Sequence, residues 1–82
     1  MVNHMVYCDY ISNINNTVTY AYGSRVDDIT GKVIFDFSSD VIEIINSPNS
    51  SEDAPVRHIK RLYTKYRNKF KNKIFNKKIS YE

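Results

Sequence analysis

The chain has 82 residues, of which 41% are hydrophobic and 13% aromatic, and this composition excludes a disordered or low-complexity segment. A chain of this length supports one modest core, so we expect a single α+β domain over residues 1–82. The net charge of +3 is unevenly distributed: residues 1–55 carry two basic and eight acidic residues, a net −6, whereas residues 56–82 carry ten basic and one acidic residue, a net +9.

The N-terminal segment Met1–Met5 lacks the basic-then-apolar layout of a signal peptide, and no run in the chain approaches the ~18 apolar residues of a membrane span. The single cysteine, Cys8, cannot form an internal disulfide and fits a reducing compartment. We therefore expect a soluble, intracellular protein that does not act at a membrane.

Residues 1–46 are strand-rich and predict two β-hairpins. Met5–Ile11 and Thr17–Tyr22 are rich in aromatic and β-branched residues, and the asparagines between them suit a tight turn. Gly23–Gly31 is predicted to be a loop whose last residue takes a positive φ. The third strand is expected to begin near Lys32.

The second hairpin is predicted from a two-residue turn at Ser39–Asp40. This turn pairs Phe37 with Ile42 and Phe35 with Ile44 on one face of the sheet. Because these four side chains are large and apolar, we expect that face to be the core.

The same register places Asp36 opposite Glu43 on the other face, beside Ile34, Val41 and Ile45. Facing carboxylates are mildly destabilising, and exposed isoleucines favour burial. We expect another strand, a loop or a second subunit to cover this outer face in part.

A polar linker, residues 47–53, precedes a predicted amphipathic helix over residues 54–75, with Ser51 or Asp53 as its cap. Either Asn72 or Asn76 is expected to end the helix. Residues 76–82 are predicted to be a tail or a short last strand. The apolar stripe of the helix consists of Ile59, Leu62, Tyr63, Tyr66, Phe70 and Ile74. The predicted fold is thus an antiparallel sheet of about four strands, packed by one basic C-terminal helix.

The arc of this helix opposite the apolar stripe is polar and strongly basic. It contains Arg57, His58, Lys60, Arg61, Thr64, Lys65, Arg67, Asn68, Lys69 and Lys71. No acidic residue follows Asp53 in the helix, so the usual i,i+4 ion pairs are missing and like charges repel. The arc is either solvated surface, a face neutralised by the acidic part of the chain, or a binding surface. Since the sheet packs on the opposite side, we expect its acidic groups to reach flanking lysines such as Lys73 but not the far side of the helix.

A basic helical face can follow a phosphate backbone or the negative surface of a protein. We therefore predict that the partner is nucleic acid or an acidic surface of a nucleic-acid-dependent protein complex. The predicted contact residues are Arg57, His58, Lys60, Arg61, Lys65, Arg67, Lys69 and Lys71. Tyr20, Tyr22 and Tyr63 are candidates for stacking or for an interface, with membership of the core as the alternative.

Sites for catalysis or metal binding are poorly supported. Asp27-Asp28 suits a turn better than a calcium loop, and Cys8 in a strand is typical of a small core residue. A hydrolase or nuclease would depend on Asp27, Asp28 and His58 alone. We therefore expect no catalytic residue, no metal, no cofactor and no enzymatic activity.

The segments Arg57–Tyr63 and Tyr66–Phe70, with their bias toward Lys, Asn and Ile, resemble small, stand-alone proteins of AT-rich Firmicutes and their phages. In that setting such proteins are often anti-defence factors, similar to anti-CRISPR inhibitors and nucleotide-sequestering sponges. The resemblance covers the last third of the chain and implies a phage or mobile-element inhibitor in the cytoplasm of a bacterial host. The alternative hypothesis is a homodimeric or larger structural module, with a small anionic nucleotide as ligand.

Overall fold

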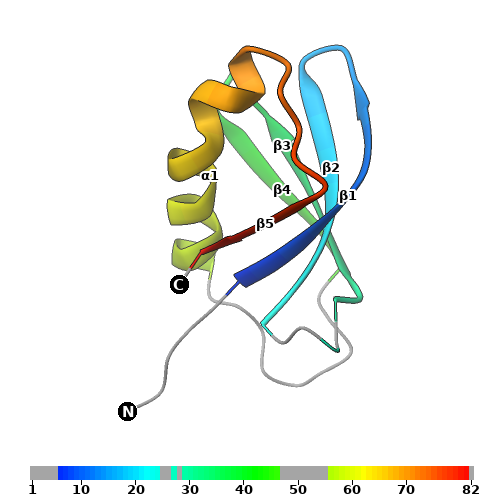
Figure 1. Ribbon diagram of the computed structural model, residues 1–82. Helices are drawn as coiled ribbons and strands as arrows, with labels where there is room; N and C mark the ends of the chain where they lie inside the picture. Colours follow the sequence, from blue (N-terminus) through cyan, green and yellow to red (C-terminus); the bar gives the residue numbers. More distant parts are fainter. Residues whose placement is uncertain (1–5, 25–26, 28, 47–55, 82) are drawn as a thin grey trace.

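The computed structural model of the chain describes residues 6–24, 27, 29–46 and 56–81, without the side chains of residues 56 and 57. Within these residues, five strands form one antiparallel sheet in the order β4-β3-β2-β1-β5, and one helix lies along one face of it (Figure 1). The elements are β1 (Val6–Ile14), β2 (Thr17–Gly23), β3 (Gly31–Asp36), β4 (Val41–Asn46), α1 (Val56–Lys71) and β5 (Lys78–Tyr81). The predicted α+β fold class is confirmed.

Strands β1 and β2 form the predicted first hairpin. Asn15 occupies its turn with a φ of 54°, a left-handed conformation that asparagine tolerates better than most residues. The strands extend further than predicted, because residues 12–14 pair with β2 instead of forming the connection. The register shifts between Tyr10 and Ser12, and beyond this bulge Ile14 pairs with Thr17.

The second hairpin keeps the predicted faces but not the predicted register. Phe35 lies opposite Ile42 and Asp36 opposite Val41, so the pairing differs by two residues from the predicted one. A shift of two preserves the alternation of side chains, and the core face is therefore as predicted. The predicted juxtaposition of Asp36 and Glu43 is wrong.

The turn of this hairpin explains the change in register. One carboxylate oxygen of Asp36 accepts hydrogen bonds from the backbone N–H of Ser38 and Ser39, at 3.1 and 3.2 Å, and from the Ser38 hydroxyl at 2.8 Å. These bonds stabilise a turn over residues 37–40 instead of the predicted two-residue turn. Asp40 closes the turn with a φ of 58°, and this conformation fixes where its side chain lies.

The connection between β2 and β3 is shorter than predicted, because Gly23 belongs to β2 and Gly31 begins β3 opposite Tyr22. The predicted positive φ of Gly31 is wrong, since no glycine in the described ranges has one. The third strand begins within one residue of the predicted position.

Helix α1 ends at Lys71, next to Asn72, the earlier of the two predicted stops, so the helix is shorter than the predicted range 54–75. Lys73 has a φ of 60° and donates its N–H to the carbonyl of Phe70 at 2.9 Å, while the N–H of Ile74 bonds the carbonyl of Lys69 at 2.8 Å. This pair of bonds is a Schellman C-cap, here with lysine where glycine is common. Ile74, predicted to belong to the apolar stripe, therefore lies outside the helix and is exposed.

Residues 78–81 form β5, which pairs antiparallel with β1 and confirms the short last strand. The predicted linker 47–53, with its capping residues Ser51 and Asp53, lies outside the described residues. Strand β5 forms one edge of the sheet and β4 the other, so the helix is flanked by one edge strand on each side (Figure 1).

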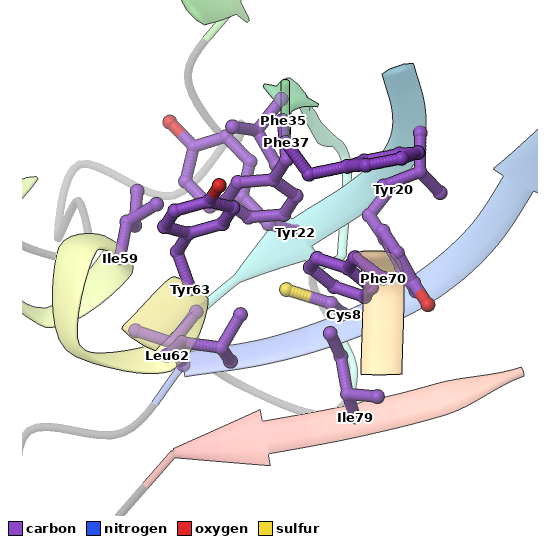
Figure 2. Close-up of a cluster of buried hydrophobic side chains, with 13 residues drawn as sticks. Cys8, Tyr20, Tyr22, Phe35, Phe37, Ile59, Leu62, Tyr63, Phe70 and Ile79 are labelled. Carbon is purple, nitrogen blue, oxygen red and sulfur yellow. The ribbon is translucent and has the colours of Figure 1, made fainter. Parts of the chain in front are cut away.

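The core lies between the inner face of the sheet and α1, and Figure 2 shows its side chains meeting in one cluster. Phe70 is central to the cluster, with its ring 5.6 Å from that of Phe35, 6.0 Å from Tyr20 and 6.1 Å from Tyr63. Aromatic pairs at such distances add to the stabilisation that burial provides. The buried set is Val6, Cys8, Val18, Tyr20, Tyr22, Val33, Phe35, Phe37, Ile59, Leu62, Tyr63, Phe70 and Ile79.

No described helix or strand covers the outer face of the sheet. Ile14, Val41 and Ile45 project from this face and are 67%, 53% and 46% exposed. The predicted partial cover by another strand is not found in the described ranges.

Candidate functional site

Helix α1 carries the candidate surface, and its sequence contains no acidic residue. The side chains of Lys60, Arg61, Lys65, Lys69 and Lys71 are exposed, as are Thr64 and Asn68 between them. The ion pairs within the described part of the chain are those of Arg67 with Asp40 and of Lys78 with Asp9. The five exposed cations of α1 therefore have no carboxylate within ion-pair distance among these residues.

Arg67 is partly exposed, but its charge is paired. It donates from Nε and a terminal nitrogen to the two carboxylate oxygens of Asp40, at 2.8 and 2.9 Å, and Tyr63 donates its hydroxyl to the same carboxylate at 2.6 Å. The Arg67 hydrogen bonds, followed by that from Tyr63, lower the pKa of Asp40. Asp40 thus reaches a residue on the flank of the helix, as expected for the acidic part, but that residue is Arg67 and not the expected Lys73.

His58 does not lie on the exposed face either. It is 7% exposed, and its ring centroid lies 6.3 Å from that of Tyr81 in β5. The expected place of His58 on the exposed basic face is therefore wrong. The side chain of Arg57, the remaining predicted contact residue at this end of the helix, is outside the described part.

Three of the exposed cations form a row. Arg61, Lys65 and Lys69 are four residues apart, so successive members are about 6 Å apart along the helix axis and about 40° apart around it. We call these three residues the basic row. Lys60 and Lys71 lie on the other flank of α1, toward β4. The predicted single face thus consists of two flanks with different surroundings.

Tyr66 lies beneath the basic row and is half-buried. The amino groups of Lys65 and Lys69 lie 5.4 and 5.8 Å from the centre of its ring, within the range of cation–π attraction. Lys65 also donates to the carbonyl oxygen of Ser80 in β5 at 3.4 Å. The sequence gives one signal for this arrangement, a lysine three residues after the tyrosine, which lies on the same side of the helix. The contact of Lys65, the residue adjacent to Tyr66, is not indicated by its spacing.

The three tyrosines considered for stacking on bases are in the core, so the alternative reading is the correct one. Tyr20 and Tyr22 are buried, and Tyr20 donates its hydroxyl to the carbonyl oxygen of Asn76 at 2.9 Å. Tyr63 is also buried, and burial together with the bond to Asp40 raises the pKa of Tyr63 to about 12. None of these three rings is available to a nucleobase.

Lys73 is bound to backbone instead of a carboxylate, contrary to the prediction. Its amino group donates to the carbonyl oxygen of Asn15 at 2.7 Å and lies 5.0 Å from the centre of the Phe37 ring. This contact ties the end of α1 to the β1–β2 turn, so Lys73 stabilises the fold and is less accessible to a partner.

Three of the residues considered for catalysis, Cys8, Asp27 and His58, are described by the structure, whereas Asp28 lies outside the described residues. Cys8 is buried, and burial raises the pKa of its thiol to about 12, so it is not a thiolate near neutral pH. Asp27 is exposed in a turn, whereas His58 packs beside β5. No group of three or more His, Cys, Asp or Glu side chains that could hold a metal ion occurs in the described ranges.

Comparison with protein-family models, with curated proteins and with solved structures finds no match for this chain. Helix α1 is neither long nor apolar enough to cross a membrane, and the described residues contain no other candidate.

Proposed function

We propose that this protein is a non-enzymatic binding protein that engages a polyanion through the basic row. Nucleic acid is the first candidate, and an acidic surface of a nucleic-acid-dependent protein complex is the second. One observation carries the proposal: three regularly spaced cations, Arg61, Lys65 and Lys69, have no carboxylate within ion-pair distance among the described residues.

The energetics of the helix support this proposal. Like charges four residues apart repel by roughly 0.2–0.5 kcal/mol per pair in an isolated helix. The basic row contains two such pairs, Arg61 with Lys65 and Lys65 with Lys69. A bound phosphate backbone removes this repulsion and releases counterions, so binding and helix stability favour each other.

The cellular role is proposed from the resemblance of the C-terminal third to small Firmicutes and phage proteins. In this proposal the protein is an anti-defence inhibitor, comparable to an anti-CRISPR protein, and acts in the cytoplasm of a bacterial host. It blocks a nucleic-acid-dependent effector by occupying either its nucleic acid or its acidic surface.

The test compares two double variants with the same change of charge. Arg61→Glu with Lys65→Glu reverses two charges of the basic row, whereas Lys32→Glu with Lys60→Glu reverses two exposed charges elsewhere. Fluorescence anisotropy with labelled duplex DNA, single-stranded DNA and RNA at low salt is expected to show at least about tenfold weaker binding for the first variant only. Circular dichroism controls for the fold.

Two results would count against the proposal. Equal losses in both variants would mean that net charge, and not the basic row, governs binding. Absence of wild-type binding to any of the nucleic acids and to candidate effector complexes at low salt would exclude the polyanion partner altogether.

A second candidate function, a homo-oligomeric module with a small anionic nucleotide as ligand, is favoured by the exposed Ile14, Val41 and Ile45 on the outer sheet face. Large apolar side chains that stay exposed on one face of a sheet favour burial against a partner. Light scattering at high protein concentration tests it: a dimer that Val41→Lys with Ile45→Lys dissociates would support this function, and a monomer at every concentration would exclude it.

A further inference from the structure

A groove with a volume of about 280 Å³ lies between α1 and β4, on the opposite flank of the helix from the basic row. Its lining consists of Asp40, Ile42, Ile44, Lys60, Tyr63 and Thr64. At one end of the groove, Tyr63 and Arg67 both donate hydrogen bonds to Asp40. These bonds fix the positions of the lining residues at that end. Because this end is tied to the β3–β4 turn, helix and strand cannot easily close on each other there.

Strand β4 gives this groove a hydrogen-bonding edge. It is the outermost strand on this side of the sheet, and no described strand pairs with its other side. Alternate residues of an edge strand present backbone N–H and C=O groups outward, which is where an added strand binds. Ile42 and Ile44 are half-buried and line the groove from the same strand, so apolar surface lies next to the free edge.

The α1 side of the groove carries a positive charge, whereas the β4 side is apolar. Lys60 is exposed there and makes no ion pair with a described residue. Asp40, the acidic residue of the lining, is already bound by Arg67 and Tyr63. A ligand with an apolar part and a carboxylate therefore fits the groove better than a basic one.

We propose that this groove binds an extended segment of a partner protein, which pairs antiparallel with β4 as a sixth strand. Apolar side chains of that segment pack on Ile42 and Ile44, and a carboxylate on the same face of the segment pairs with Lys60. Strand addition of this kind gives affinity through the main chain and specificity through alternate side chains. The proposal concerns a separate surface and does not depend on polyanion binding by the basic row.

A second copy of this chain is a poorer occupant of the groove. Symmetric pairing of β4 with itself would place two basic helices side by side on the same face of a continuous sheet. One symmetric register would also place Glu43 opposite its own copy, and facing like charges are destabilising. The proposed partner segment supplies a carboxylate next to Lys60, which β4 of a second copy does not.

The probe for the test is the capped peptide Thr-Glu-Thr-Val-Lys-Val-Thr. When it lies antiparallel to β4, its valines reach Ile44 and Ile42, its glutamate lies on the groove side toward Lys60, and its lysine lies next to Glu43 on the outer face. Titration into the ¹⁵N-labelled full chain is expected to shift the amide signals of β4 and of residues 60–64. The peptide with glutamate and lysine exchanged, identical in composition, is expected to bind more weakly.

Backbone methylation of the peptide separates strand addition from simple apolar contact. Only every second peptide N–H points toward β4, so methylating that set is expected to weaken binding at least about tenfold, whereas methylating the other set leaves it unchanged. Thr64→Trp, which fills the groove, is expected to abolish binding. Asn68→Trp, on the solvent side of the same helix, serves as the control.

Three results would overturn the proposal: no shifts at about 1 mM peptide, equal effects of the two methylation patterns, or shifts confined to other surfaces. A dimer that Thr64→Trp disrupts would also overturn it, because the occupant would then be a second copy. Nucleic-acid binding in the same samples shows whether the basic row works independently of the groove.

Discussion

The two flanks of α1 carry the same kinds of residue in very different surroundings. On the flank toward β4, Arg67 makes a bidentate ion pair with Asp40, and the same carboxylate accepts a hydrogen bond from the Tyr63 hydroxyl. On the flank toward β5, Lys65 and Lys69 contact the ring of Tyr66, and no described carboxylate lies within ion-pair distance of them. A cation of the first flank stabilises the tertiary structure, whereas those of the second remain available to a partner.

The difference shows that the number of basic residues on a helical face does not tell how many of them lack a carboxylate partner. One acidic side chain, placed by a single turn, neutralises Arg67, although the nearest neighbours of Arg67 in sequence are basic or polar. Binding is therefore expected to depend on the basic row, and folding on the opposite flank and the core beneath it.

The largest expected effect on the free energy of unfolding comes from the buried side of α1, and the exposed side serves for comparison. Phe70→Ala removes the ring at the centre of the core and is expected to lower the free energy of unfolding by about 3–5 kcal/mol. Asn68→Ala, on the exposed side, is expected to change it by no more than about 0.5 kcal/mol. Urea denaturation measures both, and similar losses would show that the faces of the helix are assigned wrongly.

A smaller effect is expected from the ion pair of the β4 flank. The pKa of Asp40 is lowered in the folded protein, chiefly by the Arg67 hydrogen bonds. The resulting stabilisation is complete above the unfolded carboxyl pKa of about 4 and is lost as the pH falls through the lower folded pKa. Asp40→Asn is therefore expected to lower the Tm at neutral pH, by less than Phe70→Ala does, and to differ less from wild type in acid.

Glu43→Gln is the matched control for this pH dependence, because it removes an exposed carboxylate from the same hairpin without touching Arg67. Its Tm is expected to stay close to that of wild type across the series. A constant difference between Asp40→Asn and wild type at all pH values would contradict the assigned role of the carboxylate.

The smallest effect is expected on the β5 flank. Lys65→Glu converts two repulsive i,i+4 pairs of the basic row into attractive ones, while it removes the contact with Tyr66. We expect the free energy of unfolding to stay within about 0.5 kcal/mol of wild type, on the stabilising side at low salt. Thermal unfolding at low and high salt, with Lys60→Glu as control, checks this. A loss of stability that salt does not change would indicate that Lys65 is a structural residue.

The sequence predicts the faces of these elements better than their ends. The period of two along the strands and of 3.6 along the helix identifies Phe35 and Phe70 as core residues, and a register shift of two leaves these faces unchanged. Neither the turn held by Asp36 nor the left-handed Lys73 that ends the helix could be predicted. Both depend on local hydrogen bonds that several sequences satisfy equally well.

The candidate site was predicted as a whole helical arc, and the structure divides it. His58 is not part of the exposed arc, because β5 lies against the first turns of α1 and covers it. The periodicity of the sequence does not predict where a short last strand lies. Arg67 is removed because the β3–β4 turn brings Asp40 next to it. The basic row remains, and its i,i+4 spacing was already visible in the sequence.

The salt dependence of duplex DNA binding tests the role of the basic row most directly. If the contact consists of three cations, log K is expected to fall with log[salt] with a slope of about −2.7, and Lys65→Ala to reduce that slope to about −1.8. Lys60→Ala, on the opposite flank, is expected to leave the slope unchanged. Equal reductions in the two variants, or a wild-type slope near zero, would contradict the assignment of free charge to the basic row.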